Sequence, residues 1–383
     1  MKSLHVFYGD DFAGGASYSM ASIVVSLAKR GHESHAIIPR TKTKMMRNYL
    51  QENGVIVHEA FIPWLVYDSC NHSMLYRVKK AVKAFTYRFF ALPFTEHVIG
   101  RIIRENGIDI VHIGGAVISS GYMAAKKNSC KVVWHIREYV QEDYALEFLP
   151  SINPYEKMQN ADVLICVSNA IKKKMSSICP NTDVITVYNG IDTSLFYPKN
   201  DPAGTSSTTR IMFAGGITEL KGTFVALEAV AAVAKVVPIK FDIFGRASNE
   251  ALERLSVFCS ENDLENIVEY KGMAQSIADE YRSHDIQIVA SKCEAFGRVT
   301  AESMLCRCLV IGADSGGTVE LLDGGRGIIF KAGDGNSLAK AILWAIENSD
   351  KTESILNQAY DFAHERLMLD EYVDRIESVY LSL

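Results

Sequence analysis

The sequence predicts an α/β protein built from two doubly wound domains with parallel sheets. Short apolar runs alternate with helical patterns along all 383 residues, as in strands whose two faces are covered by helices. A chain of this length suggests two domains of ordinary size. The polar, turn-forming stretch at 200–210 (NDPAGTSSTTR) interrupts the alternation, so we expect it to link the two domains.

The first domain is expected at residues 1–195. It begins with a strand at 3–9 and an apolar-faced helix at 17–31, which Gly31 ends, and continues with a strand at 33–39. Further short apolar runs predict strands at 109–115, 130–136, 161–168 and 183–190. This order of strands and helices is typical of a doubly wound sheet.

The same pattern restarts after the linker, in a second domain that we place at 209–365. Its predicted strands lie at 211–216, 239–245, 268–272, 286–291, 309–313 and 327–330. A long helix is expected from about Gly222, and a C-terminal helix at about 366–383 is expected to pack back on the first domain. Ligands of such sheets bind beyond the carboxyl ends of the strands, so two facing domains would hold a ligand in the cleft between them.

Composition excludes several classes of function. Hydrophobic residues make up 48% and charged residues 22%, which indicates a globular chain, and the net charge of −5 argues against nucleic acid as the main partner. The eight cysteines form no CxxC pair and no Cys/His cluster, so we expect buried thiols, a reducing compartment and no structural zinc. Neither a signal peptide nor an apolar run of roughly 18 residues is evident, which favours a cytoplasmic protein.

Glycine-containing loops follow four of the predicted strands. They are GDDFAGGASYS at 9–19, FAGGITELKG at 213–222, EAFGRVTAE at 294–302 and ADSGGTVEL at 313–321. Glycine lets a ligand approach the backbone, and the helix that follows offers N–H groups to a phosphate. None matches the dinucleotide fingerprint or the P-loop, and glycine in such turns often serves packing alone. Four such loops, one with Lys221 at a helix entrance, favour a diphosphate ligand.

Two acids, Glu294 and Glu302, stand on either side of Gly297. On one helix they would lie about 12 Å apart along the axis, too far for a carboxylate dyad. We therefore expect a strand that ends near Ala290, a loop that carries Glu294 and a helix that opens near Gly297 and carries Glu302. The two acids would then serve different parts of one bound molecule.

Four segments in this order carry a resemblance to a known family. They are ADVLICVSNAIKKK at 161–174, VYNGIDTSLFYP at 187–198, the Lys-Gly pair at 221–222 and EAFGRVTAE at 294–302. Together they resemble the retaining nucleotide-sugar glycosyltransferases of family 4, the glycogen-synthase-like group. The resemblance covers nearly the whole chain and is strongest from Ala161 to Leu322. It implies the GT-B fold, which has two facing Rossmann-like domains with an interdomain cleft.

The resemblance also implies roles for residues of the second domain. Glu302 would accept hydrogen bonds from the ribose hydroxyls, Glu294 would face the donor sugar near the reacting carbon, and Lys221 would neutralise the departing diphosphate. Backbone N–H groups of Phe296 and Gly297 would hold sugar hydroxyls, and those of Val299 and Thr300 would hold the diphosphate. Met273 would lie where the backbone reads the nucleobase.

The chain departs from the family at the strand end that holds Gly215 and Gly216. An arginine commonly follows the first glycine there, so Arg246 or Arg298 would have to supply the missing charge.

In the first domain, the resemblance implies that His135 lies near the donor sugar and reaction centre. A lone histidine at a strand end is often merely packed. Gly14 and Gly15 match the glycine loop that approaches the phosphates or the acceptor, and Arg137 and Glu138 would shape the acceptor pocket.

These residues predict a retaining, metal-independent glycosyltransferase that uses a UDP- or GDP-sugar, with UDP favoured, and no other cofactor. The chain has no Asp-x-Asp pair, the usual holder of a divalent cation in metal-dependent sugar transferases. The acceptor would be a glycan or a lipid-linked glycan, in polysaccharide or glycoconjugate biosynthesis. Two alternatives are a GT-B nucleotide-sugar epimerase and a non-catalytic partner subunit that keeps the fold for binding.

A basic segment at 77–94 (RVKKAVKAFTYRFFALPF) carries five cations and no acid. Its apolar residues share one helical face; they are Val78, Val82, Phe85, Phe89 and Leu92. We expect the aliphatic members of this face to be buried in the first domain. The aromatic residues and the single sign of charge also fit a helix at the inner surface of a membrane, as a peripheral contact.

Overall fold

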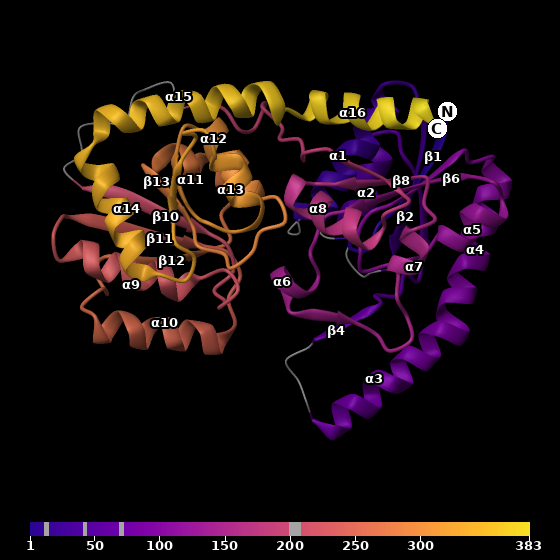
Figure 1. The fold of residues 1–383 in the computed structure, drawn as a ribbon, viewed down its shortest axis with the longest axis horizontal. Coiled ribbons are helices and arrows are strands. Elements are labelled where there is room, and N and C mark those ends of the chain that lie inside the picture. The colour runs from indigo at the N-terminus through magenta and orange to yellow at the C-terminus, as the bar shows by residue number, and fades with distance from the viewer. Residues whose placement is uncertain (11–14, 41–43, 69–72, 199–207) are drawn as a thin grey trace. The chain divides into compact units, whose positions relative to one another are not determined.

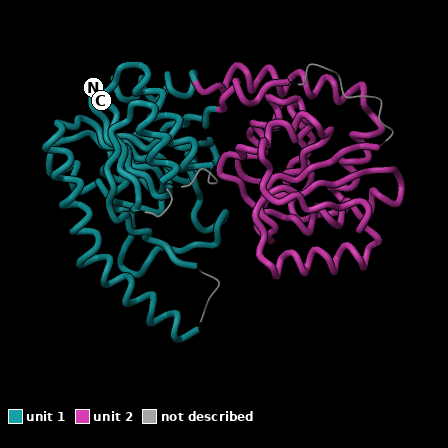
Figure 2. Tube along the Cα trace, turned by 180° about the vertical axis from the view of Figure 1, so that it is seen from behind, with its two compact units in different colours: residues 1–190, 370–383 teal, residues 191–369 magenta. Residues whose placement is uncertain are grey.

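The computed structural model describes residues 1–10, 15–40, 44–68, 73–198 and 208–383. Figure 2 shows two compact units, one of residues 1–190 with 370–383 (unit 1) and one of residues 191–369 (unit 2). Each has its own parallel sheet with helices packed against it, so the predicted α/β class with two doubly wound domains is confirmed. Most of the predicted linker, and Gly14, lie outside the described residues.

Unit 1 is built on a seven-stranded parallel sheet. In spatial order its strands are β3 (Ile56–Ala60), β2 (Glu33–Pro39), β1 (Lys2–Val6), β5 (Ile110–Ile113), β6 (Lys131–Ile136), β8 (Val163–Cys166) and β9 (Asp183–Thr186). Of these, β3 was not predicted. A separate antiparallel pair joins β4 (Val66–Asp68) to β7 (Leu146–Phe148).

Most helices of unit 1 pack around this sheet, and the helix α3 extends away from it (Figure 1). They are α1 (Gly15–Lys29), α2 (Met45–Glu52), α3 (Met74–Thr86), the π-helix η1 (Tyr87–Ala91), α4 (Leu92–Asn106), α5 (Tyr122–Lys127), α6 (Gln141–Tyr144), α7 (Tyr155–Met158), α8 (Asn169–Ile178) and α16 (Leu369–Ser382). The C-terminal α16 is held on α1 by Arg30, whose guanidinium donates to Asp374 at 2.6 Å and to Glu377 at 2.7 Å.

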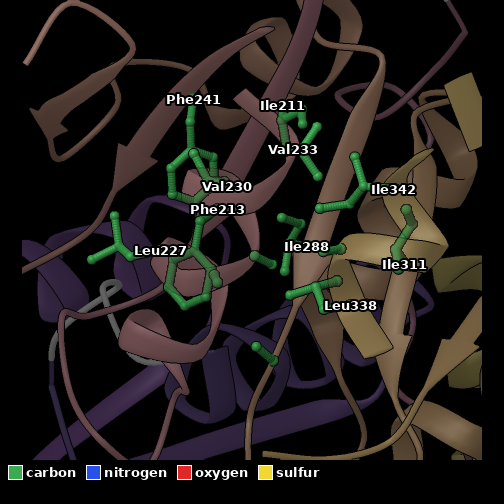
Figure 3. Packing of buried hydrophobic residues seen from close by; sticks show 14 of the residues in the cluster. Ile211, Phe213, Leu227, Val230, Val233, Phe241, Ile288, Ile311, Leu338 and Ile342 are labelled. Carbon is green, nitrogen blue, oxygen red and sulfur yellow. The ribbon is translucent and has the colours of Figure 1, made fainter. Parts of the chain in front are cut away.

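Unit 2 has a six-stranded parallel sheet in the order β12 (Val268–Gly272), β11 (Ile239–Phe244), β10 (Thr209–Ala214), β13 (Ile286–Val289), β14 (Leu309–Ala313) and β15 (Ile328–Phe330). Its helices are α9 (Thr223–Ala234), α10 (Asn249–Glu261), α11 (Ile277–Ser283), α12 (Arg298–Leu305), α13 (Gly316–Leu322), α14 (Gly335–Glu347) and α15 (Ser349–Arg366). Figure 3 shows the apolar core between sheet and helices, where Phe241 and Ile288 of the strands meet Leu227 of α9 and Ile342 of α14.

The strand order reverses direction between β1 and β5 in unit 1 and between β10 and β13 in unit 2. Consecutive crossovers leave on opposite sides of the sheet at such a point, and ligands of doubly wound sheets bind beyond the carboxyl ends of the strands there. In unit 2 the loops after these two strands are 215–222 and 290–297, which carry Lys221 and Glu294.

The expectation that the aliphatic residues of the apolar face at 77–94 are buried is wrong for Val78 and Val82 and is confirmed for Leu92. Val78 is 53% exposed and Val82 59%, and Leu92 alone of that face is buried. Helix α3 lies on the short β4–β7 pair instead of the seven-stranded sheet, and only a narrow side around Ala84 packs with Leu65 and Leu149. A two-stranded ribbon cannot cover both sides of an amphipathic helix, so the wide apolar face stays in solvent. No described helix is long and apolar enough to cross a membrane.

Candidate functional site

Lys221 and Glu294 meet beyond the carboxyl ends of β10 and β13 in unit 2. Lys221 Nζ lies 2.6 Å from Glu294 Oε1, and the hydroxyl of Ser291 donates to the same oxygen at 2.6 Å. The carboxylate is mostly buried, with 15% of its side chain exposed, while 36% of the lysine side chain is exposed. The pair thus places a cation and an acid side by side, each still reachable from solvent.

Gly222 explains why Lys221 comes so close to this loop. It adopts a left-handed conformation with φ of +71°, and a Cβ on it would lie 2.0 Å from the carbonyl oxygen of Ala290. The amide of Lys292 donates to the carbonyl of Leu220 at 2.9 Å and ties the two loops together. Only glycine allows this approach, so the Lys-Gly pair sets the distance between Lys221 and Glu294.

A second glycine pair holds the Glu294 loop from its other side. A Cβ on Gly316, whose φ is +53°, would lie 2.3 Å from the carbonyl oxygen of Glu294, and the amide of Gly317 donates to that oxygen at 2.7 Å. The sequence marked this glycine pair only as part of a loop. Its contact with a loop 22 positions earlier in the chain leaves no local signal, and neither does the contact of Ser291 with Glu294.

Glu302 lies on α12 with partners of its own, as the prediction of a loop and a helix around Gly297 requires. Arg298 Nη2 donates to Oε1 at 2.8 Å, and the Tyr281 hydroxyl donates to Oε2 at 3.4 Å. Burial raises the pKa of Glu302, while the charge of Arg298 acts to lower it. Each carboxylate oxygen can accept a further hydrogen bond, so ribose hydroxyls can join these partners. Tyr281 was not identified from the sequence.

Helix α12 begins at Gly297, whose φ is +89° and which supplies no side-chain cap. Its first turn therefore presents Val299 at a helix N-terminus, where backbone N–H groups favour an anion. The amide of Thr300, in contrast, donates to the carbonyl of Gly297 at 3.0 Å. Thr300 is fully buried, and its Oγ1 has no hydrogen-bond partner among the described residues. Phe296 is buried beside Gly317, so the loop before the helix is fixed by packing.

The turn after β10 contains Gly215 and Gly216. The amide of Ile217 donates to the carbonyl of Arg246 at 3.1 Å, and a Cβ on Gly245 would lie 2.2 Å from the carbonyl oxygen of Gly215. Arg246 therefore borders the position where the family has its arginine, whereas the guanidinium of Arg298 already binds Glu302. Met273 follows β12 and is 59% exposed.

In unit 1 the imidazole of His135 is fully buried in the sheet under α16. It stacks on His112 of β5 at 5.3 Å between ring centroids, and His112 lies 5.3 Å from His5 of β1. The ring of Tyr372 packs edge-on against His135, and the hydroxyl of Tyr380 bonds His112 Nδ1. In this structure His135 is a core side chain of a three-histidine row, and its contact with a donor sugar stays a prediction.

The hydrogen bonds of this row fix where its protons sit. Arg137 Nη2 can only donate, so His135 Nδ1, at 3.2 Å, is an acceptor and carries no hydrogen. His112 Nε2 then donates to the same atom at 3.2 Å. His135 thus carries its hydrogen on Nε2, which is buried and has no partner among the described residues.

Burial keeps all three histidines neutral. It lowers the pKa of His5 to about 3, with a smaller contribution from His35, and holds the pKa of His112 and His135 well below the usual value. The unfolded chain binds protons at these positions below pH ~6.5 and the folded chain does not. The three histidines therefore make their full contribution to the free energy of unfolding above that pH, and this contribution is lost as the pH drops below it.

We expect His112→Gln to flatten this acid dependence. Between pH 4.5 and 6, the free energy of unfolding of the wild type falls as the pH decreases. In the variant the slope of this fall should be smaller by about 1.4 kcal/mol per pH unit, which is the contribution of one proton. Glu138, whose pKa burial raises to about 7, contributes the opposite sign, because the folded chain holds its proton between about 4.5 and 7. That contribution cancels when urea unfolding of variant and wild type is compared. Equal slopes would contradict the account.

Glu138 and Arg137 follow β6 and are both buried. Glu138 Oε1 accepts the amides of Ala116 at 2.7 Å and Val117 at 3.3 Å, while its Oε2 has no partner among the described residues. Arg137 donates to Asn189 Oδ1 at 2.7 Å and to the Tyr372 hydroxyl at 2.8 Å. Much of its guanidinium is therefore engaged in hydrogen bonds within unit 1. Gly15 opens α1. Glu138 Oε2 and Arg137 Nε are the buried side-chain atoms of this pair that have no partner among the described residues, and their role toward an acceptor stays a prediction.

Two family models match the chain, one for each sheet. The model described as Glycosyltransferase Family 4 matches residues 13–195, and the model described as Glycosyl transferases group 1 matches residues 208–348. One match falls in the region of each predicted domain, and residues 349–365 of the second lie beyond its match.

Relatives and solved structures agree with these matches. An uncharacterised glycosyltransferase of Methanocaldococcus jannaschii is 26% identical over 305 residues, 78% of this chain and 82% of the relative. The N-acetyl-alpha-D-glucosaminyl L-malate synthase of Bacillus anthracis is 22% identical over 385 residues, 96% and 93% of the two chains. The crystal structure of Anabaena Alr3699/HepE in complex with UDP has a TM-score of 0.78 at 20% identity, over 100% of both chains. At that identity the likeness shows the fold.

Proposed function

Because the chain is a glycosyltransferase of the GT-B type, we propose that it transfers a sugar from a UDP-sugar to a glycan or lipid-linked acceptor with retention of configuration. The observation that carries this proposal is the Lys221–Glu294 pair at the point of unit 2 where the strand order reverses. The cation there contacts the loop that leads into the N-terminus of α12. That arrangement suits a diphosphate that gains charge as it leaves.

In this proposal Lys221 and the first turn of α12 neutralise the diphosphate, so no divalent metal is required. Glu294 loses its ion pair when Lys221 turns to the phosphates, and its carboxylate then accepts hydroxyls of the donor sugar. Ser291 keeps one of its oxygens in place. Arg246, beside Gly216, supplies a second cation.

Binding of UDP tests the nucleotide site. Glu302→Gln should weaken UDP binding about tenfold, because the amide replaces a charge-assisted acceptor of two ribose hydroxyls. The matched control is Glu320→Gln, a carboxylate on the neighbouring α13 to which the proposal assigns no role. Isothermal titration gives both affinities. Equal affinity of wild type and Glu302→Gln for UDP would contradict the ribose assignment.

On the acceptor side, we propose that Glu138 Oε2 receives a hydrogen bond from the acceptor and that unit 1 touches an anionic membrane. The exposed fractions of Phe85, Phe89 and Phe94 are 59%, 55% and 64%, and Val78 and Val82 extend the same surface. Cations flank it, and residues 77–94 contain no acid. An apolar face with one sign of charge binds an anionic bilayer surface peripherally. A membrane contact would bring a lipid-linked acceptor to the enzyme.

A further inference from the structure

A groove of about 690 Å³ runs along α4 on the outside of unit 1, and the function proposed above assigns it nothing. It is lined by residues of α4, of α5 and of the segment 151–157, in which α7 begins; Figure 1 labels these three helices. Its volume is in the range of small-molecule sites.

Cations outnumber acids along this groove. Its lining includes Arg88, Arg104, Lys127 and Lys157, against Glu96 and Glu156. In the described part of the chain, neither Arg104 nor Lys127 forms an ion pair. The groove therefore presents an excess of positive charge to a ligand.

Glu96 offsets part of this positive charge, because it interacts electrostatically with Lys157, but the backbone also occupies its carboxylate. Its two oxygens accept the amide of Gly121 at 3.1 Å and the amide of Ala124 at 2.7 Å, which fixes the start of α5. Lys157 Nζ donates to Ser119 Oγ at 2.9 Å and has no acid within ion-pair distance among the described residues. Burial lowers the pKa of Lys157. The charge of Glu96 acts to raise the same pKa, and an anion bound beside Nζ would add to this counter-charge.

One end of the groove is formed by residues of the segment 77–94, which also carries the exposed apolar face described above. Arg88, Leu92 and Pro93 line that end, and the guanidinium of Arg88 donates to the carbonyl of Ser151 at 3.1 Å in the segment 151–157. Phe89, Phe90 and Phe94, which alternate with these residues, are all more than half exposed. A cationic groove thus adjoins a surface that suits acyl chains.

We propose that this groove binds the phosphate headgroup of an anionic phospholipid while the aromatic residues beside it contact the acyl region. The inference rests on the membrane contact proposed above and adds a chemical preference to it. Charge alone would attract every anionic surface equally, whereas converging guanidinium and ammonium groups in a groove favour a phosphate.

Vesicle sedimentation tests this preference. We compare phosphatidylcholine vesicles that contain phosphatidic acid with vesicles brought to the same surface charge by oleate, which has no phosphate. The wild type should bind the phosphatidic acid vesicles about tenfold more tightly, the effect of roughly one charge-assisted contact. Arg104→Gln/Lys127→Gln should bind both kinds equally. Lys29→Gln/Lys173→Gln, which removes the same charge from other exposed sites of unit 1, should keep the preference.

The outcomes separate this inference from the proposals on which it rests. Phe85→Ser/Phe89→Ser should weaken binding to both vesicles, and all these variants should keep wild-type affinity for UDP. If the wild type binds both vesicles equally, or if Arg104→Gln/Lys127→Gln keeps the preference, the groove assignment is wrong and the membrane contact stands. If the wild type ignores both vesicles at low salt, the membrane contact fails too. Displacement by soluble glycerol 3-phosphate at equal concentration would overturn the lipid as the source of the phosphate.

Discussion

Lys221→Ala should lower the turnover number about 10²–10³-fold, the range found when one group that stabilises transition-state charge is removed. The charge on the diphosphate grows as the glycosidic bond breaks, so the loss should appear mainly in kcat and less in KM for the donor. UDP released per unit time at saturating donor is the measurement. Affinity for UDP should fall by a smaller factor, since the ground state carries less charge at that point.

The neighbouring lysine provides the control. Lys292 lies on the Glu294 loop with an exposed side chain, and Lys292→Ala removes the same charge from the same surface without touching the carboxylate. Its turnover should match the wild type. Lys221→Ala also leaves the mostly buried Glu294 with Ser291 as its remaining side-chain partner, at a cost of about 1–2 kcal/mol. Near-normal turnover of Lys221→Ala would show that the lysine does not act on the leaving group.

Gly222→Ala should destabilise unit 2 by about 2–5 kcal/mol, the sum of left-handed strain and the overlap with a fixed backbone atom. The added methyl group would lie 2.0 Å from the carbonyl oxygen of Ala290, and no flexible side chain can yield there. Hydrogen exchange of the β10 and β13 amides reports the loss for unit 2 alone. Turnover should fall as well, because the turn that places Lys221 against Glu294 has to move.

Gly272→Ala separates the two contributions. Gly272 has nearly the same φ, +68°, but no atom lies within 4 Å of a Cβ there. That variant should lose only the strain, about 1–2 kcal/mol. Equal losses at the two positions would mean that the approach of Gly222 to Ala290 is not what fixes this loop.

Sequence pattern was sufficient for the architecture because the apolar runs of buried parallel strands are local signals. The predicted strands at 33–39, 268–272 and 309–313 coincide with β2, β12 and β14. The separation of Glu294 and Glu302 into a loop and a helix followed from one glycine, and Gly297 does start α12 with a positive φ. The contacts of Ser291, Tyr281 and Gly316 with these acids left no comparable signal, because they depend on how the loops pack.

Periodicity also cannot tell which partner an apolar helical face meets. Val78, Val82 and Phe85 have the spacing of a core helix, yet the short β4–β7 pair behind α3 covers another side of it. His135 shows the same limit in reverse. The family resemblance implied a place near the donor sugar for His135, and strand pairing and α16 place its ring among His112 and Tyr372, a contact that the strand pattern alone does not predict.

The most direct measurement of the central claim follows the sugar that leaves the donor. The UDP-sugar that stabilises the protein most in a thermal-shift panel is incubated with it in EDTA, and slow transfer to water is observed by NMR. We predict release of UDP together with the α-anomer of the sugar, before mutarotation, at a rate that EDTA leaves unchanged and Lys221→Ala lowers. Release of the β-anomer, appearance of an epimeric UDP-sugar in place of free sugar, or complete loss in EDTA that magnesium or manganese restores would contradict the account.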